Sequence, residues 1–207
     1  MKNIVIGLTG QTGAGKSTVS SAMEKCGCGI INADKIAREV VEPKTDCIKM
    51  LTNAFGCDII NQDGGLNRKR LAEKAFSSAE NTELLNAITH PHIVKLTKQR
   101  IAEYFSNGCK IVVFDAPQLF ESGSDKLCDI IVSVTASQEC RLKRIIDRDG
   151  ISREQALARM KVQLSEEYFK EHSDYIINGE QDINTVAREA ADFIEAVKNG
   201  EFLNRER

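Results

Sequence analysis

Five short runs of apolar residues, each bounded by polar residues, predict five buried strands. Val and Ile dominate these runs, as is typical of strands that a parallel sheet buries on both faces. The predicted strands cover residues 2–9, 29–33, 110–115, 129–134 and 174–177.

Between these runs, apolar residues recur every three to four positions, which predicts helices. The predicted helices cover residues 17–25, 35–41, 48–55, 68–76, 82–105, 137–148, 152–169 and 183–198. We expect an interruption near His90 and Pro91, because a proline ring clashes with the preceding helical turn. Strands that alternate with helices predict an α/β fold with a parallel sheet and helices on both faces. A chain of 207 residues is enough for one compact domain, so we predict a single domain over 1–207.

Composition narrows the class of partner. The net charge is −2, which gives no reason to expect a nucleic acid partner. No segment approaches the roughly 18 apolar residues that span a bilayer, and the apolar run from Ile4 to Leu8 is too short for a signal peptide. We therefore expect a cytoplasmic protein without a membrane partner. The seven cysteines include no CxxC pair, so reduced thiols are expected.

The stretch GQTGAGKS fits the pattern G-x-x-x-x-G-K-S and lies between a predicted strand and a predicted helix. Its glycines let backbone N–H groups turn toward phosphate oxygens, and the helix N-terminus adds partial positive charge. Lys16 is expected to bridge the β- and γ-phosphates of a nucleotide, and the Ser17 hydroxyl to ligate Mg²⁺. The residues expected to bind ATP in this loop are Gly13, Ala14, Gly15, Lys16, Ser17 and Thr18.

The rest of the chain narrows the type of nucleotide-binding protein. A guanine-reading N-K-x-D is absent, and the DxxG at Asp147 lies in a helical region, which argues against a GTPase. Arg144, Arg148 and Arg159 follow the fourth predicted strand, and they predict a lid at about 144–165. Such a lid closes over the ATP phosphates and offsets the charge of the transition state. Arg144 and Arg148 are the expected catalytic residues of the lid, and Arg148 and Arg159 are expected to bind ATP. The alternative for each arginine is a solvated helix surface.

The whole chain resembles the dephospho-CoA kinase family. The resemblance rests on GLTGQTGAGKSTV, INADKIAREVVEP, LNAITHPHI, FDAPQLFES and RLKRIIDRDGISREQALARMKVQ. Generic P-loop kinases do not share INADKIAREVV, whereas FDAPQLFE resembles the family's D-x-P-L-L-F-E and ARMKVQ its A-R-x-x-x-Q. The resemblance implies transfer of the γ-phosphate of ATP to the 3′-hydroxyl of the dephospho-CoA ribose, giving CoA. It also implies a P-loop kinase core with a lid and a helical CoA-binding insertion at about 60–105.

Asp34 matches the general base of that family. An acid at the end of a predicted strand, within reach of an acceptor hydroxyl, agrees with this role, but Asp34 equally suits the N-cap of the helix at 35–41. Arg38 lies on the same helix face as Asp34, so it either reaches the substrate or pairs with Asp34. His90 belongs to the family's H-P dipeptide and is either part of the substrate wall or structural. Asp115 ends the third strand, where it either holds Mg²⁺ or the acceptor, or is a turn residue.

The chain departs from the family pattern at three positions. The family usually has D-A-D where this chain has Asn32, Ala33 and Asp34, so the first acid is uncharged here. Gln118 replaces a Leu of D-x-P-L-L-F-E, and Gly179 stands where an Asn is common. Two rival functions stay open on the residues alone: another small-molecule kinase, of the nucleoside-monophosphate or shikimate type, and a regulatory module that hydrolyses ATP slowly.

Overall fold

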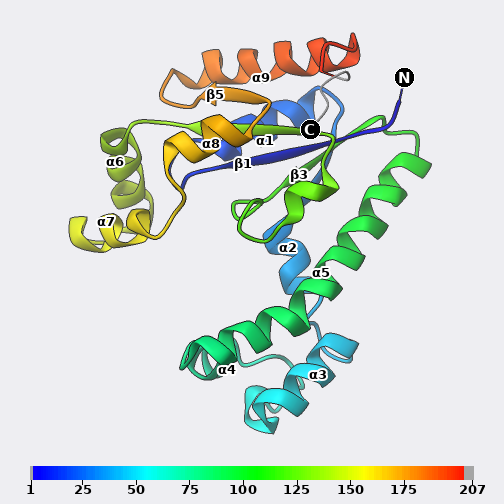
Figure 1. The fold of residues 1–207 in the computed structure, drawn as a ribbon, viewed down its shortest axis with the longest axis vertical. Coiled ribbons are helices and arrows are strands. Elements are labelled where there is room, and N and C mark those ends of the chain that lie inside the picture. The colour runs from blue at the N-terminus through cyan, green and yellow to red at the C-terminus, as the bar shows by residue number, and fades with distance from the viewer. Residues whose placement is uncertain (1, 203–207) are drawn as a thin grey trace. The chain divides into compact units, whose positions relative to one another are not determined.

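A computed structural model of the chain describes residues 2–202, so that Met1 and residues 203–207 of the predicted domain lie outside it. The described chain forms two compact units (Figure 1). Unit 1 contains the residues up to Ile31 and from Glu103 onward, and unit 2 contains Asn32–Ala102. Each unit is described by itself below.

A five-stranded sheet forms the centre of unit 1. Its order is β2-β3-β1-β4-β5, and β1 pairs in parallel with both β3 and β4, as β4 does with β5. Leu8 of β1 lies opposite Asp115 of β3, so the carboxyl ends of these two strands are neighbours. The parallel sheet predicted from the apolar runs is confirmed, and every predicted strand agrees with its observed bounds to within two residues. Those bounds are β1 (Ile4–Gly10), β2 (Gly29–Asn32), β3 (Ile111–Asp115), β4 (Ile130–Thr135) and β5 (Tyr175–Asn178).

Helices α1 and α9 pack against each other on one face of this sheet (Figure 1). They bury apolar side chains such as Met23 and Phe193 against the strands. Helix α8 contacts β4 and buries Phe169. The helices and 3-10 turn of unit 1 are α1 (Lys16–Lys25), η2 (Ser124–Leu127), α6 (Gln138–Asp149), α7 (Arg153–Lys161), α8 (Glu166–His172) and α9 (Ile183–Lys198).

The prediction of one helix over 152–169 is wrong, because the chain breaks between α7 and α8. The hydroxyl of Ser165 accepts a hydrogen bond from the backbone N–H of Tyr168 at 3.2 Å and so caps the start of α8. Serine side chains favour such caps over helix interiors. A capping box of Ser152 and Gln155 fixes the start of α7 in the same way.

Unit 2 is helical. Its elements are α2 (Ala33–Glu39), α3 (Asp46–Phe55), η1 (Cys57–Ile59), α4 (Arg68–Ala75) and most of α5 (Ala79–Ser106). The predicted interruption of α5 is wrong, since the helix runs through Pro91. A proline removes one N–H donor from the helical ladder, and the chain here nevertheless forms one continuous helix of 28 residues. The CoA-binding role predicted for the insertion at about 60–105, most of which lies within unit 2, stays a prediction.

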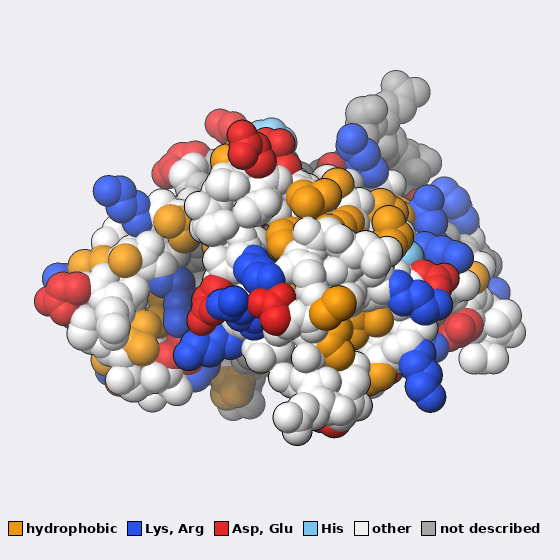
Figure 2. Space-filling view, turned by 90° about the horizontal axis from the view of Figure 1, so that it is seen from below, with side chains coloured by type: hydrophobic (Ala, Val, Ile, Leu, Met, Phe, Trp, Pro, Cys, Tyr) orange, Lys and Arg blue, Asp and Glu red, His pale blue; other side chains and the backbone are white. Residues whose placement is uncertain are grey.

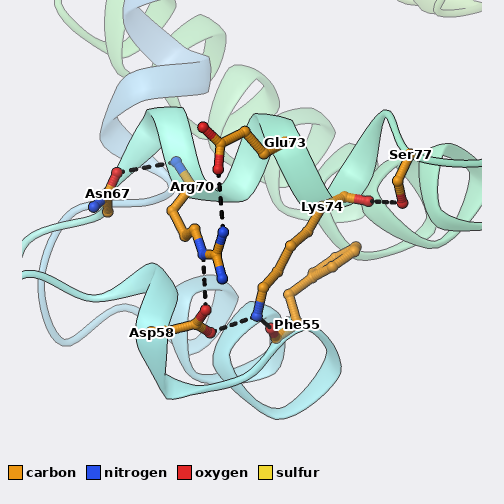
Figure 3. Close-up of polar contacts among 7 residues, drawn as sticks. All are labelled: Phe55, Asp58, Asn67, Arg70, Glu73, Lys74 and Ser77. Atoms are coloured by element: carbon orange, nitrogen blue, oxygen red, sulfur yellow. Dashed lines mark hydrogen bonds and ion pairs between the residues drawn. The ribbon is translucent and has the colours of Figure 1, made fainter.

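An ionic cluster around Asp58 fastens α4 to η1 (Figure 3). The Asp58 carboxylate accepts from Arg70 Nε at 2.9 Å and from the ammonium of Lys74, which also donates to the Phe55 carbonyl at 2.5 Å. These cations lower the pKa of Asp58 to about 2, with Lys74 the largest cause. Arg70 therefore has a structural role in this unit.

Candidate active site

The glycine loop lies between β1 and α1 and is shaped to surround an anion. Gly15 precedes α1 with φ of +104°, a backbone conformation that residues with a side chain rarely adopt. No side chain caps the N-terminus of α1 in the described structure. The N–H groups of its first turn therefore point at the loop without a side-chain partner, which is the arrangement that binds phosphate at helix N-termini.

Gly13 brings the loop into close contact with α6. A Cβ atom at this position would lie 2.8 Å from the carbonyl oxygen of Arg141, and the φ of Gly13 is +80°. The Arg144 guanidinium of α6 donates to the carbonyl oxygens of Gly13 and Ala14, each at 3.3 Å. Arg144 thus holds the outer side of the loop, and sequence reasoning had assigned it only to catalysis.

Lys16 and Asp115 form an ion pair at the carboxyl ends of β1 and β3. Both side chains are largely buried, with 17% and 7% of their surfaces exposed. Ser17 is exposed and Thr18 is half-buried at the start of α1. The structure therefore places the expected phosphate-binding lysine against Asp115, whereas Ser17 follows that lysine in the first turn of α1.

The expected lid arginines are paired with an acid that sequence reasoning missed. Asp149 accepts from Arg148 Nε at 2.7 Å and from Nη2 at 2.9 Å, and it also accepts from Arg159 of α7. These contacts lower the pKa of Asp149 to about 2, with Arg148 the largest cause. Arg148 and Arg159 therefore lie side by side at Asp149, where α6 ends and α7 approaches it.

Asp34 is not the N-cap of α2. The side chain of Asn32 takes that place, because its Oδ1 accepts from the backbone N–H of Lys35 at 3.0 Å. Asn caps helices as well as Asp does, so the departure from D-A-D keeps the cap. Asp34 lies within the first turn of α2 and is exposed, so capping does not use its carboxylate.

Arg38 and His90 are also exposed in unit 2, on α2 and α5 respectively. Among the described residues Arg38 makes no ion pair with Asp34, so the predicted alternative of a mutual pair is not found. The neighbouring Glu39 pairs instead with Arg100 of α5, which holds α2 against α5. Asp34, Arg38 and His90 thus share unit 2, and their approach to the glycine loop stays a prediction.

The loop after β5 packs against the glycine loop at Gly179, a position that the sequence marked only as a departure from the family pattern. A Cβ atom at Gly179 would lie 1.8 Å from the Ala14 carbonyl oxygen, so the two backbones touch directly. The carboxylate of Glu180 accepts from the backbone N–H of Ser137 at 3.2 Å and from its hydroxyl at 2.8 Å. The loop after β5 is therefore fixed to both the glycine loop and the start of α6.

Comparison with known proteins identifies the family. The family model described as dephospho-CoA kinase matches residues 4–185. A dephospho-CoA kinase from Corynebacterium glutamicum is 42% identical over 173 residues, which is 84% of this chain and 89% of that protein. A solved structure from Thermus thermophilus aligns with a TM-score of 0.80 at 28% identity and covers 96% of this chain and 98% of its own. The dephospho-CoA kinase structure from Campylobacter jejuni aligns with a TM-score of 0.73 at 26% identity, over 97% of this chain and 100% of its own. The chain belongs to the dephospho-CoA kinase family.

Proposed function

We propose that this protein transfers the γ-phosphoryl group of ATP, bound with Mg²⁺, to the 3′-hydroxyl of the dephospho-CoA ribose. The dephospho-CoA kinase family phosphorylates dephospho-CoA with ATP in the final step of CoA biosynthesis. One observation carries the proposal for this chain. The family match runs from residue 4 to residue 185, so it includes the glycine loop, Asp34, Asp115 and the α6–α7 arginines.

Lys16 and the N-terminus of α1 are the proposed binding site for the ATP phosphates. A buried ammonium beside backbone N–H groups offsets the charge that accumulates on the transferred phosphoryl group. Asp115 pairs with Lys16 and so holds its ammonium at the ends of β1 and β3. ATP binding then places the phosphates against a cation whose position is already fixed.

Ser17 and Asp115 are the proposed protein ligands of Mg²⁺. A hydroxyl and a carboxylate are the hard oxygen donors that Mg²⁺ prefers, so the donor set fits the ion. Within residues 2–202, no group of three or more His, Cys, Asp and Glu side chains forms a metal site. When bound, the ion neutralises charge on the phosphates.

Asp34 is the proposed general base, which accepts the proton of the 3′-hydroxyl as its oxygen attacks. Because Asn32 caps α2, the Asp34 carboxylate stays free for this role. Arg38 and His90 are proposed to bind dephospho-CoA from the same unit. The reaction also needs the arginines of α6 and α7. Arg148 and Arg159 must leave Asp149 to reach phosphate oxygens, whereas Arg144 already bonds the glycine loop.

A cytoplasmic location without nucleic acid or membrane partners completes the proposal. On the face drawn in Figure 2, basic and acidic side chains are mixed near the centre, and several basic ones gather toward the right side. The net charge of the whole chain is −2, which gives no reason to expect a nucleic acid partner. None of the helices within residues 2–202 combines the length and the apolar character that crossing a bilayer requires.

The test is ADP release from MgATP with dephospho-CoA, and in parallel with shikimate and CMP as control acceptors. The proposal predicts strong stimulation by dephospho-CoA alone. Stimulation by shikimate or CMP instead would favour another small-molecule kinase. Rapid ADP release without any acceptor would favour the regulatory module.

A further inference from the structure

Two hydrogen bonds join the glycine loop to the chain that follows α7. The side-chain Nε2 of Gln11 donates to the carbonyl of Leu164 at 3.0 Å, and the backbone N–H of Thr12 donates to Oε1 of Gln163 at 3.1 Å. Residues 162–165 connect α7 to α8. We call these two bonds the arm-base contact, because they lie where the arm made of α6 and α7 (residues 138–161) returns to the core.

The connector that carries Gln163 and Leu164 is held at both ends. The N–H of Gln163 donates to the Met160 carbonyl at 3.2 Å in the last turn of α7. On the other side, Ser165 caps α8, whose Phe169 is 1% exposed in the core. The connector therefore offers Gln163 and Leu164 to the glycine loop in a fixed geometry.

Gln11 is buried in a way that stability alone does not explain. Its side chain is 6% exposed, and its Oε1 is buried without a hydrogen-bond partner in the described part of the chain. An unpaired buried acceptor costs free energy that offsets what the Nε2 bond contributes. A methionine of similar length would fill the same space without that cost.

A side chain of α6 also holds the loop. Arg144 of α6 bonds the carbonyls of Gly13 and Ala14, while the arm-base contact fixes Gln11 and Thr12. Four consecutive loop residues are thus held, two by Arg144 of α6 and two by the connector that follows α7. Two of these four residues, Gly13 and Ala14, and the residues that follow them are expected to bind phosphate through their N–H groups.

We propose that Gln11 and Gln163 are positioning residues for the nucleotide. The arm-base contact holds residues 11 and 12 so that the loop keeps its phosphate-binding shape before ATP arrives. A loop that is already ordered loses less conformational entropy on binding, and its ligand binds more tightly. This inference rests on the proposed ATP site and gives these two residues a role that acts through the glycine loop.

The test measures dissociation constants for a non-hydrolysable ATP analogue with Mg²⁺, by titration calorimetry. The variants are Gln11→Met, Gln163→Leu and the double variant, with the exposed Gln99→Leu of α5 as the matched control. Each single variant should bind the analogue about three- to ten-fold more weakly, the range for one hydrogen bond. The two changes remove different bonds of the same contact, so the double variant should bind the analogue at least as weakly as either single variant.

Kinetics separate positioning from a general effect on folding. The KM for MgATP should rise with the dissociation constant, while kcat, the KM for dephospho-CoA and the melting temperature stay near those of the unchanged protein. Unchanged analogue binding in both single variants would overturn the inference. So would equal losses for both substrates with a lower melting temperature, or a double variant that binds the analogue like the unchanged protein.

Analogue binding needs no acceptor, so the two proposals fail separately. If the unchanged protein binds the analogue but does not phosphorylate dephospho-CoA, the proposed function fails. The dissociation constants of the variants then still decide the positioning role. If the unchanged protein binds no analogue, both proposals are overturned.

Discussion

Gly179 is the position where adding one carbon atom should damage nucleotide binding most. A Cβ atom there would lie 1.8 Å from the Ala14 carbonyl oxygen and 2.9 Å from Cγ1 of Val134. No left-handed φ is involved at this residue, so the clash alone is tested. Gly179→Ala adds only this atom. Gly179→Asn adds the same atom together with a larger polar side chain.

The size of the effect follows from the displacement that the clash requires. Ordinary contacts of a Cβ begin at 3.4 Å, so the loop after β5 or the glycine loop must move by about 1.6 Å, the difference from 1.8 Å. Neither moves freely. Gly179 N–H donates to the Thr135 carbonyl at 2.8 Å, and Arg144 bonds Ala14 at 3.3 Å. Misplacement of about 1 Å costs on the order of 10²-fold in rate, so both variants should lose about 10²-fold in kcat/KM for MgATP.

The assay is initial-rate ADP release with saturating dephospho-CoA, beside calorimetric binding of a non-hydrolysable ATP analogue. Gly27→Ala is the matched control, since its Cβ would meet no heavy atom within 4 Å and its cost is backbone strain at φ of +87°. It should lower the melting temperature without changing the KM for MgATP. If Gly179→Ala or Gly179→Asn binds and turns over ATP like the unchanged protein, the described packing of Gly179 on Ala14 is wrong.

Three further predictions follow from the site and from unit 2. Asp34→Asn should lower kcat by about 10²–10⁴-fold, the range for a lost general base, and should leave binding of the ATP analogue near normal. Lys16→Ala should instead weaken both analogue binding and turnover. If Asp34→Asn turns over almost as fast as the unchanged protein in the same assays, Asp34 is not the base. Asp149→Asn should lower the KM for MgATP by about two- to five-fold, because it removes the carboxylate that competes with phosphate for Arg148 and Arg159. A raised KM would contradict this and would show that Asp149 helps to place these arginines. The pKa of Asp58 is lowered from 3.8 to about 2, so its ion pairs stabilise unit 2 above pH 3.8, and this stabilisation is lost as the pH falls toward 2. Asp58→Asn should therefore lower the melting temperature at pH 7 and flatten its decline between about pH 4 and pH 2, and thermal scans that match the unchanged protein at every pH would contradict this.

The sheet of this fold was predictable because its strands carry their own signal. Continuous apolar runs such as Ile111–Asp115 can be buried only as central strands, and helices between them impose parallel pairing. The glycine loop was predictable for the same reason, since its spacing and its flanking elements suffice. Helix ends were harder. Ser165 breaks a helical pattern by capping, and Asn32 competes with Asp34 for one cap, so their neighbours in space decide the outcome.

The contacts between distant segments could not be predicted from the sequence. Asp149 is one of several acids near the lid arginines, and only the meeting of α6 with α7 selects it as their partner. Gln163 was visible as a motif letter, but its bond to Thr12 joins residues 151 positions apart. Gly179 was visible in the sequence as a departure from the family pattern. The atom that leaves no room for a Cβ there, the Ala14 carbonyl oxygen, lies in another loop.

The most direct test of the proposed reaction identifies its product. The protein is incubated with MgATP and dephospho-CoA, and the product is examined by mass spectrometry and by ³¹P nuclear magnetic resonance. The account predicts one new phosphomonoester on the ribose 3′-oxygen, formed in a one-to-one ratio with ADP and greatly slowed in Asp34→Asn. Inorganic phosphate in place of that phosphomonoester, or a phosphoryl group at any other position, would contradict it.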